Sequence, residues 1–565
     1  MKTNLSHATL IAVPVLLFIT LNVWQVAAQQ GLSSGLPAPT ATFRARRDRV
    51  MQAAPDALVL VRSRSSIMSE NEDGFRQDAT FYYLTGLENA VQAVLVMDSR
   101  RHESWLFVPA PGQLRGLLHV PYGYVEPGKA AAERLGLDHL VIWDEFEPFV
   151  DRRLAEDPSL VIRGQFLTAR TTATASVLTL QSERRLWDNV LKARWPQSQF
   201  GPMPDPIALR AIKDADEVAA LRRVALSSSA ALRAGLAALR PGRRQRDAEV
   251  DVLAACVRGG AEGISFWPWL MTGINSDLAV AFQSLADNGF LDRTMRAGEL
   301  ARVDVGCAKD HYEGDVGRTA PVSGHFDQGQ REAWDLFVYA YRVAMNAIKP
   351  GKTSQDVLAA WQLVFQQQRS QLRTPFGKRT AEVVLSKEGR MFWQMHGVGL
   401  DSAEGLIDTF ATGQVLAFEP ILTVDGVGLY LEDMILVTPG GAEVLTKGLP
   451  YTSFEIEATM RRGTALKKVG VENSRRKRPT VGHAIPAGQK LTPPIGVEVI
   501  KVGGLIRACL PGKQTVRNYK VEALTILDAA RDEPVATLRE MWRTGPTQTW
   551  VASKHDHQFK LSSLS

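Results

Sequence analysis

The sequence has few cysteines, with only Cys256, Cys307 and Cys509 in 565 residues. Disulfide-dependent domains carry an even set of closely spaced cysteines, and structural zinc sites carry paired ones. An odd, scattered set has neither pattern. We therefore expect no disulfide framework and no zinc site built on thiolates.

Long apolar runs are also missing, except near the N-terminus. Lys2 precedes an almost continuous apolar stretch from Leu10 to Val26, and Ala27 and Ala28 follow with small side chains. This layout predicts a secretory signal peptide at 1–28, followed by a linker at 29–41. We expect the mature protein to be exported, periplasmic or secreted, with no membrane span after cleavage. An uncleaved membrane anchor stays open, because a run of about 17 residues is near the lower limit for crossing a bilayer.

The sequence has no strong excess of either charge, since its formal net charge is +6. The last part differs, because residues 461–565 hold 19 Lys and Arg against 8 Asp and Glu. That segment shows no sustained helical or strand period, and we expect a basic, poorly ordered extension. A nucleic-acid interaction would rest on this tail alone, so no nucleic-acid partner is expected.

The hydrophobic pattern divides the rest of the chain into two domains. Short apolar runs at 57–61, 94–97 and 104–108 alternate with helical stretches such as 130–135, which predicts an α/β domain over 42–200. Residues 205–455 mix helical periods with strand-like runs and predict an α+β domain. Its expected helices are 214–239, 247–258 and 331–348, and its expected strands are 300–305, 314–322, 415–418 and 429–437.

Two aspartates lie in the strand-like runs of the second domain. Asp304 sits in Val-Asp-Val-Gly, and Asp315 follows eleven residues later in Gly-Asp-Val-Gly-Arg-Thr. The polar segment 307–313 between them suits a hairpin loop, which would place both carboxylates on one side of a two-stranded ribbon. Two carboxylates within apolar strands are costly to bury unless a cation neutralises them. Two acids on the surface of an amphipathic ribbon are the alternative.

One histidine and two glutamates complete the set. His396 is flanked by glycine in His-Gly-Val-Gly-Leu, Glu419 ends the apolar run Val-Leu-Ala-Phe-Glu-Pro, and Glu432 stands inside Leu-Tyr-Leu-Glu-Asp-Met-Ile-Leu-Val. Glutamate is rarely buried in such runs without a partner. Four carboxylates and one imidazole favour two divalent ions, with manganese expected and cobalt, iron or zinc as alternatives.

The order of these motifs resembles the ligand series of the pita-bread metallopeptidases, the group that holds methionine aminopeptidase, prolidase and aminopeptidase P. The segment Phe75–Gly86 is similar to the N-terminal domain of aminopeptidase P, and Ile212–Glu217 resembles the start of its catalytic domain. The chain is identified as a member of the Xaa-Pro aminopeptidase and prolidase family, over about residues 40–455. The resemblance implies a pita-bread catalytic domain after a creatinase-type N-terminal domain.

The family resemblance also implies an activity, a dinuclear metal-dependent hydrolase acting on peptides. Asp315 and Glu432 would bridge the two ions, while Asp304, His396 and Glu419 would each bind mainly one. A bridging water would attack the peptide, with Glu419 as general base. The substrate would be a peptide with proline second, cleaved after its first residue. Members of the group commonly self-associate, so a homo-oligomer is expected by analogy.

Several positions depart from the family pattern. Histidines that hold substrate in the family are replaced by Val280, Phe392 and Ala403, and an arginine two residues before the last ligand is replaced by Tyr430. Loss of a donor to the developing oxyanion typically lowers the rate about 100- to 1000-fold. The sequence therefore leaves two further readings open, a peptidase of altered specificity that uses Tyr430 or Trp393, and a metal-binding pseudo-enzyme.

Overall fold

The computed structural model describes residues 36–64, 76–88, 90–110, 127–165, 187–278, 280–281, 292–386 and 391–461, together with short strands between 490 and 563. The expected signal peptide at 1–28 lies outside the described residues. The described part of the chain contains no helix that is long and apolar enough to cross a membrane. The chain divides into one unit up to Leu466 and a second from Lys467 to Ser565.

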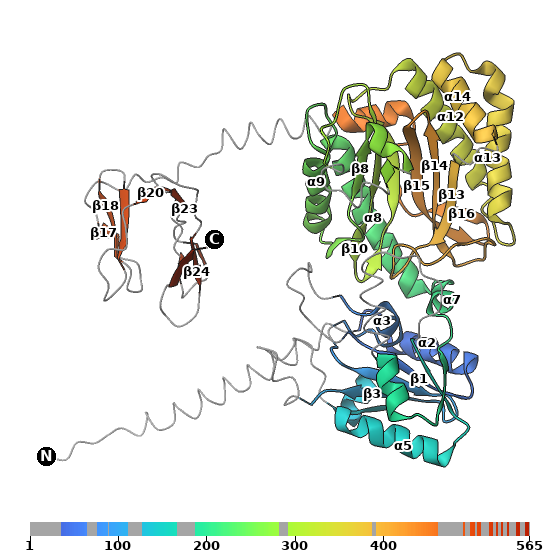
Figure 1. Ribbon diagram of the computed structural model, residues 1–565, viewed down its shortest axis with the longest axis vertical. Coiled ribbons are helices and arrows are strands. Elements are labelled where there is room, and N and C mark those ends of the chain that lie inside the picture. The colour runs from blue at the N-terminus through green and yellow to red at the C-terminus, as the bar shows by residue number, and fades with distance from the viewer. Residues whose placement is uncertain are drawn as a thin grey trace. The chain divides into compact units, whose positions relative to one another are not determined.

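The N-terminal domain is built on a mixed six-stranded sheet in the order β4-β3-β2-β1-β5-β6. Side chains of β1 alternate between two cores, because Leu58 and Leu60 face one side while Val59 and Val61 face the other. Helices lie on both faces, as the predicted α/β class requires (Figure 1). The strands are β1 (Ala57–Arg62), β2 (Val94–Asp98), β3 (Glu103–Val108), β4 (His139–Ile142), β5 (Val161–Gly164) and β6 (Gln199–Pro202); the helices are α2 (Thr40–Ala53), α3 (Ala79–Thr85), α4 (Lys129–Arg134) and α5 (Phe146–Glu156).

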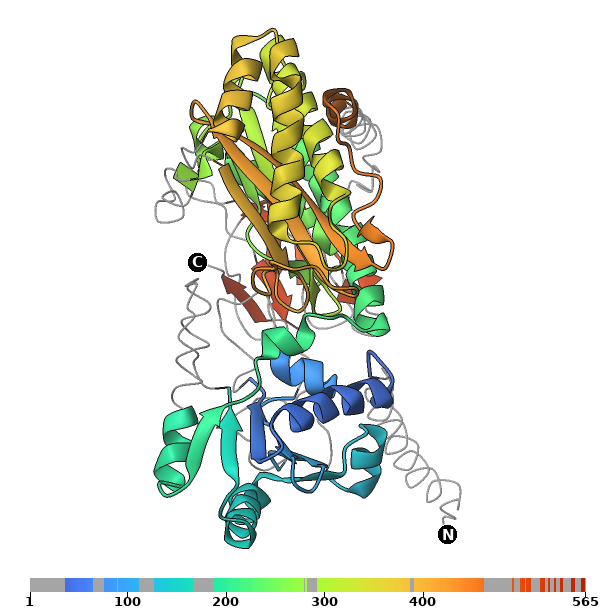
Figure 2. The same ribbon diagram turned by 90° about the vertical axis from the view of Figure 1, so that its right-hand side faces the viewer.

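The second domain has a seven-stranded antiparallel sheet in the order β13-β14-β15-β12-β9-β8, with β16 paired to β15. Its strands are β8 (Trp269–Thr272), β9 (Leu300–Val305), β12 (Val316–Pro321), β13 (Met391–Gly397), β14 (Val415–Val424), β15 (Val427–Thr438) and β16 (Gly441–Val444). Its longer helices are α8 (Ala215–Ala238), α9 (Gln245–Arg258), α12 (Gln328–Met345), α13 (Ser354–Gln368) and α14 (Pro375–Leu385), after the short α7 (Pro206–Arg210). These helices pack across the sheet strands (Figure 2), where Trp334, Phe337 and Trp361 are buried.

The segment between the two aspartates differs from the predicted hairpin loop. Residues 307–313 form two short strands, β10 (Cys307–Lys309) and β11 (Tyr312–Glu313), which join β7 (Gly263–Ile264) in a separate three-stranded sheet. Asp310 and His311 make the turn with positive φ angles of 53° and 63°. Two positive φ angles in succession match the right-handed twist of a tight hairpin. The turn is therefore only two residues long, and Asp304 and Asp315 lie at the base of a longer ribbon.

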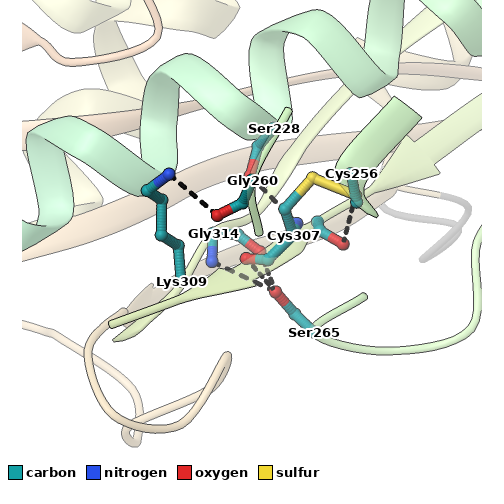
Figure 3. Close-up of a disulfide and its surroundings, with 8 residues drawn as sticks. Ser228, Cys256, Gly260, Ser265, Cys307, Lys309 and Gly314 are labelled. Carbon is teal, nitrogen blue, oxygen red and sulfur yellow. Dashed lines mark hydrogen bonds between the residues drawn. A yellow bond between two sulfur atoms is a disulfide. The ribbon is translucent and has the colours of Figure 1, made fainter. Parts of the chain in front are cut away.

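We expected no disulfide framework, but the described residues contain one disulfide that the sequence spacing did not indicate. Cys256 at the end of α9 is bonded to Cys307 at the start of β10, with both cysteines fully buried (Figure 3). Sequence spacing failed here because the cysteines are 51 residues apart, and only the packing of α9 against β10 brings their Cα atoms to 5.5 Å. The amide of Cys307 also donates to the hydroxyl of Ser228 on α8, at 3.0 Å. The disulfide thus attaches the ribbon that carries the two aspartates to the helical layer.

Charged side chains join the two domains where the catalytic domain begins. Asp214 caps α8, and its carboxylate accepts from Arg46 of α2 at 2.7 Å. The neighbouring Lys213 is buried and donates to the carbonyl of Arg210 at 2.8 Å and to the carboxylate of Glu404. Because Glu404 follows the ligand candidate His396 by eight residues, this contact fixes the loop beside the candidate site.

The described part of the basic tail consists of short strands, and the rest of 461–565 lies almost wholly outside the described residues. Five of these strands form one sheet in the order β17-β18-β19-β20-β23. The strands of the tail are β17 (Lys490–Leu491), β18 (Glu498–Val502), β19 (Leu505–Cys509), β20 (Tyr519–Ala523), β21 (Leu527–Asp528), β22 (Glu533–Pro534), β23 (Arg539–Met541), β24 (Trp550–Ser553) and β25 (Lys560–Ser563).

Candidate metal centre

The five predicted ligands come from five neighbouring strands of the catalytic sheet. Asp304 is on β9, Asp315 directly precedes β12, His396 is on β13, Glu419 is on β14 and Glu432 is on β15. These strands are consecutive in the sheet, in the order β13-β14-β15-β12-β9. Residues spread over 129 positions of sequence are thereby brought to one region of one sheet.

The imidazole of His396 lies close to three of the four carboxylates. Its Nε2 atom is 3.5 Å from an oxygen of Glu419, 3.8 Å from an oxygen of Asp315 and 4.0 Å from Oε1 of Glu432. Ligand atoms of Asp315, His396 and Glu432 all lie within 4.8 Å of one another, which is close enough to share one ion. All three side chains are buried.

The strand register places Asp304 beside this group. Gly317 of β12 pairs with Asp304 on one side and with Glu432 on the other. A side chain at position 317 would collide with Tyr430, because a Cβ atom there would lie 1.8 Å from its ring. The glycine therefore leaves room for Tyr430 between the strands that carry two of the carboxylates.

The orientation of His396 suits a ligand. Its Nδ1 atom lies 3.1 Å from the carbonyl oxygen of Gly397. A carbonyl only accepts, so this contact requires a proton on Nδ1 and leaves the lone pair of neutral imidazole on Nε2. Nε2 is the atom that faces the carboxylates, and the hydrogen bond on Nδ1 is the arrangement that usually orients a metal-binding histidine.

The electrostatics of the site show how unfavourable these side chains are without a cation. Burial raises the pKa of Asp304 to about 7, although the charge of Arg302 acts in the opposite direction. Burial and the neighbouring carboxylates raise the pKa values of Asp315 and Glu432 well above the usual range. Burial disfavours the charged form of His396, but Glu419 and Asp315 outweigh it and raise its pKa to about 9. The group therefore retains protons that a divalent ion would displace.

The residues present fit divalent ions. Oδ1 of Asp304 and Oε1 of Glu432 are buried and have no hydrogen-bond partner in the described part of the protein. Among the described residues, no Lys or Arg forms an ion pair with any of the four carboxylates. Asp315, Glu419 and Glu432 pair with His396 alone. Unpartnered buried oxygens are rare in folded proteins, and an ion would satisfy them. An oxygen-rich set with one imidazole suits manganese, iron, cobalt or zinc.

The structure describes some of the positions that lack the family histidines. It also describes His311, which with His119 is the nearest other histidine that could substitute for them. Ala403 is exposed and Val280 is partly exposed. His311 stacks on Tyr82 of the N-terminal domain, with ring centroids 4.1 Å apart, so it belongs to the domain junction. His119 and the side chains of Phe392 and Trp393 lie outside the description.

Sequence reasoning missed a buried ion pair behind the ligands. Arg318 on β12 and Asp433 on β15 are both fully buried and lie 2.9 Å apart. Arg318 also donates to the backbone carbonyl of the ligand candidate Glu432, at 2.6 Å. The sequence carries a signal for both residues, because each is a charged residue inside an apolar strand.

Comparison with known proteins agrees with this fold. The model of metallopeptidase family M24 matches residues 219–439, and that of the aminopeptidase P N-terminal domain matches residues 43–162. The chain is therefore an M24 metallopeptidase with an aminopeptidase P type N-terminal domain. The Xaa-Pro aminopeptidase of Escherichia coli K12 is 25% identical over 446 residues, which covers 74% of this chain and 97% of the relative. The chain belongs to the Xaa-Pro aminopeptidase family, a family of metallo-aminopeptidases.

Solved structures share the fold. Zinc-substituted E. coli aminopeptidase P in complex with product superposes with a TM-score of 0.58 at 24% identity, covering 75% of this chain and 99% of that one. Proline aminopeptidase P II from Yersinia pestis gives a TM-score of 0.57 at 22% identity, with coverage of 75% and 100%. The predicted fold class, a pita-bread domain after an aminopeptidase P N-terminal domain, is confirmed.

Proposed function

We propose that this chain is an exported Xaa-Pro aminopeptidase that binds two divalent ions, preferably manganese, and removes the first residue from peptides with proline second. The main support is the set of five predicted ligands on consecutive strands, where two buried carboxylate oxygens have no hydrogen-bond partner among the residues that the structure describes. The similarity to E. coli Xaa-Pro aminopeptidase over 97% of its length supports the reaction class.

Each side chain has a defined part in this proposal. Asp315 and Glu432 would hold both ions, and Asp304, His396 and Glu419 would hold one each. Bound divalent ions would supply a Lewis acid for the scissile carbonyl and make water a stronger acid. Glu419, whose carboxylate lies 3.5 Å from His396 Nε2, would accept the proton of the attacking water. The proton would then pass to the leaving nitrogen of proline.

The test combines metal content with peptide cleavage on the purified full chain. We expect about two manganese ions per chain and manganese-dependent release of the first residue from an Xaa-Pro peptide, but not from the same peptide with alanine second. Asp315→Ala and Glu432→Ala should each abolish binding of the ion pair, while Glu382→Ala, at an exposed position on α14, should retain it. Retention of two ions by either ligand variant would refute the bridging assignment.

A pseudo-enzyme or a peptidase of altered specificity is the second candidate, and the residues Val280, Phe392 and Ala403 favour it. Two ions without turnover across a peptide panel would support it. Val280→His and Ala403→His, alone and together, separate the two readings. An increase in rate on an Xaa-Pro peptide, by up to about 100- to 1000-fold, would show that the missing donors limit an otherwise competent site.

Export is a separate part of the proposal, supported by the N-terminal apolar segment and by the buried Cys256–Cys307 disulfide. Disulfides persist mainly in oxidising compartments such as the periplasm or the cell exterior. Cell fractionation with N-terminal sequencing tests it. Mature protein that begins near residue 29 in the exported fraction is expected, and full-length protein in the cytoplasmic fraction would contradict export.

A further inference from the structure

A second row of side chains lies next to the metal ligands, on the same face of the sheet. Arg302 on β9 pairs in register with Thr319 on β12, and Thr319 is hydrogen-bonded to the backbone of Tyr430 on β15. Asp304 lies two residues after Arg302 on β9, and Glu432 lies two residues after Tyr430 on β15. Both pair in register with Gly317 of β12. Because side chains two residues apart share a face of a sheet, Arg302 lies on the face of Asp304 and Tyr430 on that of Glu432.

Arg302 is an unusual residue for this place. Its side chain is only 1% exposed, and its Nε and Nη2 atoms have no hydrogen-bond partner in the described part of the chain. Its guanidinium instead lies against two aromatic rings, with Cζ 5.0 Å from the ring centre of Trp269 and 5.7 Å from that of Tyr430. An arginine keeps its charge when buried, so this cation is fixed beside the carboxylates, and its field acts on Asp304.

Tyr430 connects this cation to the ligands. It is fully buried, and its hydroxyl donates to Oε2 of Glu432. Gly317 makes the approach feasible, since any larger residue there would occupy the space of the ring. With Oε2 held in this way, the unpartnered Oε1 is the oxygen of Glu432 that lies 4.0 Å from His396.

We propose that Arg302 and Tyr430 act together as positioning residues of the metal centre. The guanidinium holds the ring of Tyr430 and offsets the repulsion among the carboxylates, and the hydroxyl fixes Glu432 with Oε1 turned toward the ions. The inference rests on the proposed function only in requiring that the site binds metal. Partners that orient metal ligands typically change metal affinity or activity about 10- to 100-fold when they are removed.

The experiment measures manganese affinity by calorimetry, metal stoichiometry and the melting temperature of the metal-free full chain. Tyr430→Phe removes one hydroxyl and leaves the packing intact. Arg302→Met removes the charge, and Arg302→Lys retains it. Arg342→Met is the control, because Arg342 is an exposed arginine whose guanidinium also lies against an aromatic ring, with Cζ 4.8 Å from the ring centre of Tyr451.

We expect Tyr430→Phe and Arg302→Met each to weaken binding of at least one ion about 10- to 100-fold. Arg302→Lys should recover most of that affinity, and Arg342→Met should bind as the wild type does. The double variant should lose less than the product of the two single losses, because the residues act through one contact. If Arg302→Met fails to fold, the isosteric Tyr430→Phe still decides the question.

Two results would overturn the inference. Variants with a lower melting temperature but wild-type metal affinity would show a purely structural role, while the proposed function would stand. A wild-type chain that binds no manganese, cobalt, iron or zinc would remove the metal site and therefore both proposals. Peptide turnover is not needed for either decision.

Discussion

The buried Arg318–Asp433 pair provides the most direct test of how the catalytic sheet is stabilised. Both side chains are fully buried. Arg318 donates to Asp433 and to backbone carbonyls that include Pro450, at 2.7 Å, while Asp433 also accepts from the hydroxyls of Thr446 and Tyr451 at 2.7 and 2.8 Å. Arg318→Met would leave a buried carboxylate with two neutral donors and no cation.

The expected cost is large because one charge of the pair stays behind. Removal of one partner of a buried ion pair costs about 3–5 kcal/mol, which is roughly a fifth or more of the 5–15 kcal/mol that stabilises a typical domain. The control is Arg222→Met, since Arg222 makes two hydrogen bonds of 2.7 Å to Glu443 but at a partly exposed position. An exposed pair of this kind contributes about 0–1 kcal/mol.

Urea unfolding followed by tryptophan fluorescence measures both losses, with Asp433→Asn and the Arg318→Met/Asp433→Asn double variant completing a thermodynamic cycle. The two single losses should sum to at least about 1 kcal/mol more than the loss in the double variant, because the pair acts as a unit. An Arg318→Met variant that loses no more stability than Arg222→Met would refute the reasoning.

Three further outcomes are expected. Reduction of the Cys256–Cys307 disulfide, which closes a loop of 51 residues, should lower the free energy of unfolding by about 4 kcal/mol. Urea unfolding with and without dithiothreitol measures this loss. A Cys256→Ala/Cys307→Ala variant should show no response to the reductant. Gly317→Ala should cost about 1–3 kcal/mol and weaken manganese binding, since its Cβ would overlap the ring of Tyr430; calorimetry with unchanged affinity would contradict this. Burial raises the pKa of Glu217 from 4.5 to about 7. Its contribution to stability is therefore fully present below about pH 4.5 and is lost as the pH rises toward 7. The free energy of unfolding should fall less steeply with pH between about 4.5 and 7 in Glu217→Gln than in the wild type.

The sequence predicted much of the architecture because hydrophobic periodicity is a local signal. The expected strands 300–305 and 429–437 correspond to β9 and β15, and the expected helix 214–239 corresponds to α8, which begins at the capping box of Asp214 and Glu217. The segment 307–313 was predicted less well. Its polar composition suggested a loop, but pairing with β7, some forty residues earlier, makes it part of a sheet.

Two features depended on contacts between distant parts of the chain. The Cys256–Cys307 bond forms because α9 packs against β10, and no spacing rule anticipates that approach. The row of Arg302 and Tyr430 exists because β9 and β15 lie on either side of β12, which places residues 128 positions apart on one surface. Sequence spacing cannot show such neighbours, because strand order within a sheet is a property of the folded chain.

The sequence by itself determined the kind of chemistry, because acidic residues inside apolar strands are costly and occur in a fixed order of motifs. It did not determine their geometry. Only the tertiary structure decided that His396 lies within 4.0 Å of three carboxylates and that Oδ1 of Asp304 and Oε1 of Glu432 have no partner among the described residues. It also decided that the buried Arg302 lies on the same face of the sheet as Asp304. The physical reason is that side-chain identity sets what a group can bind, whereas the register of five strands sets which groups meet.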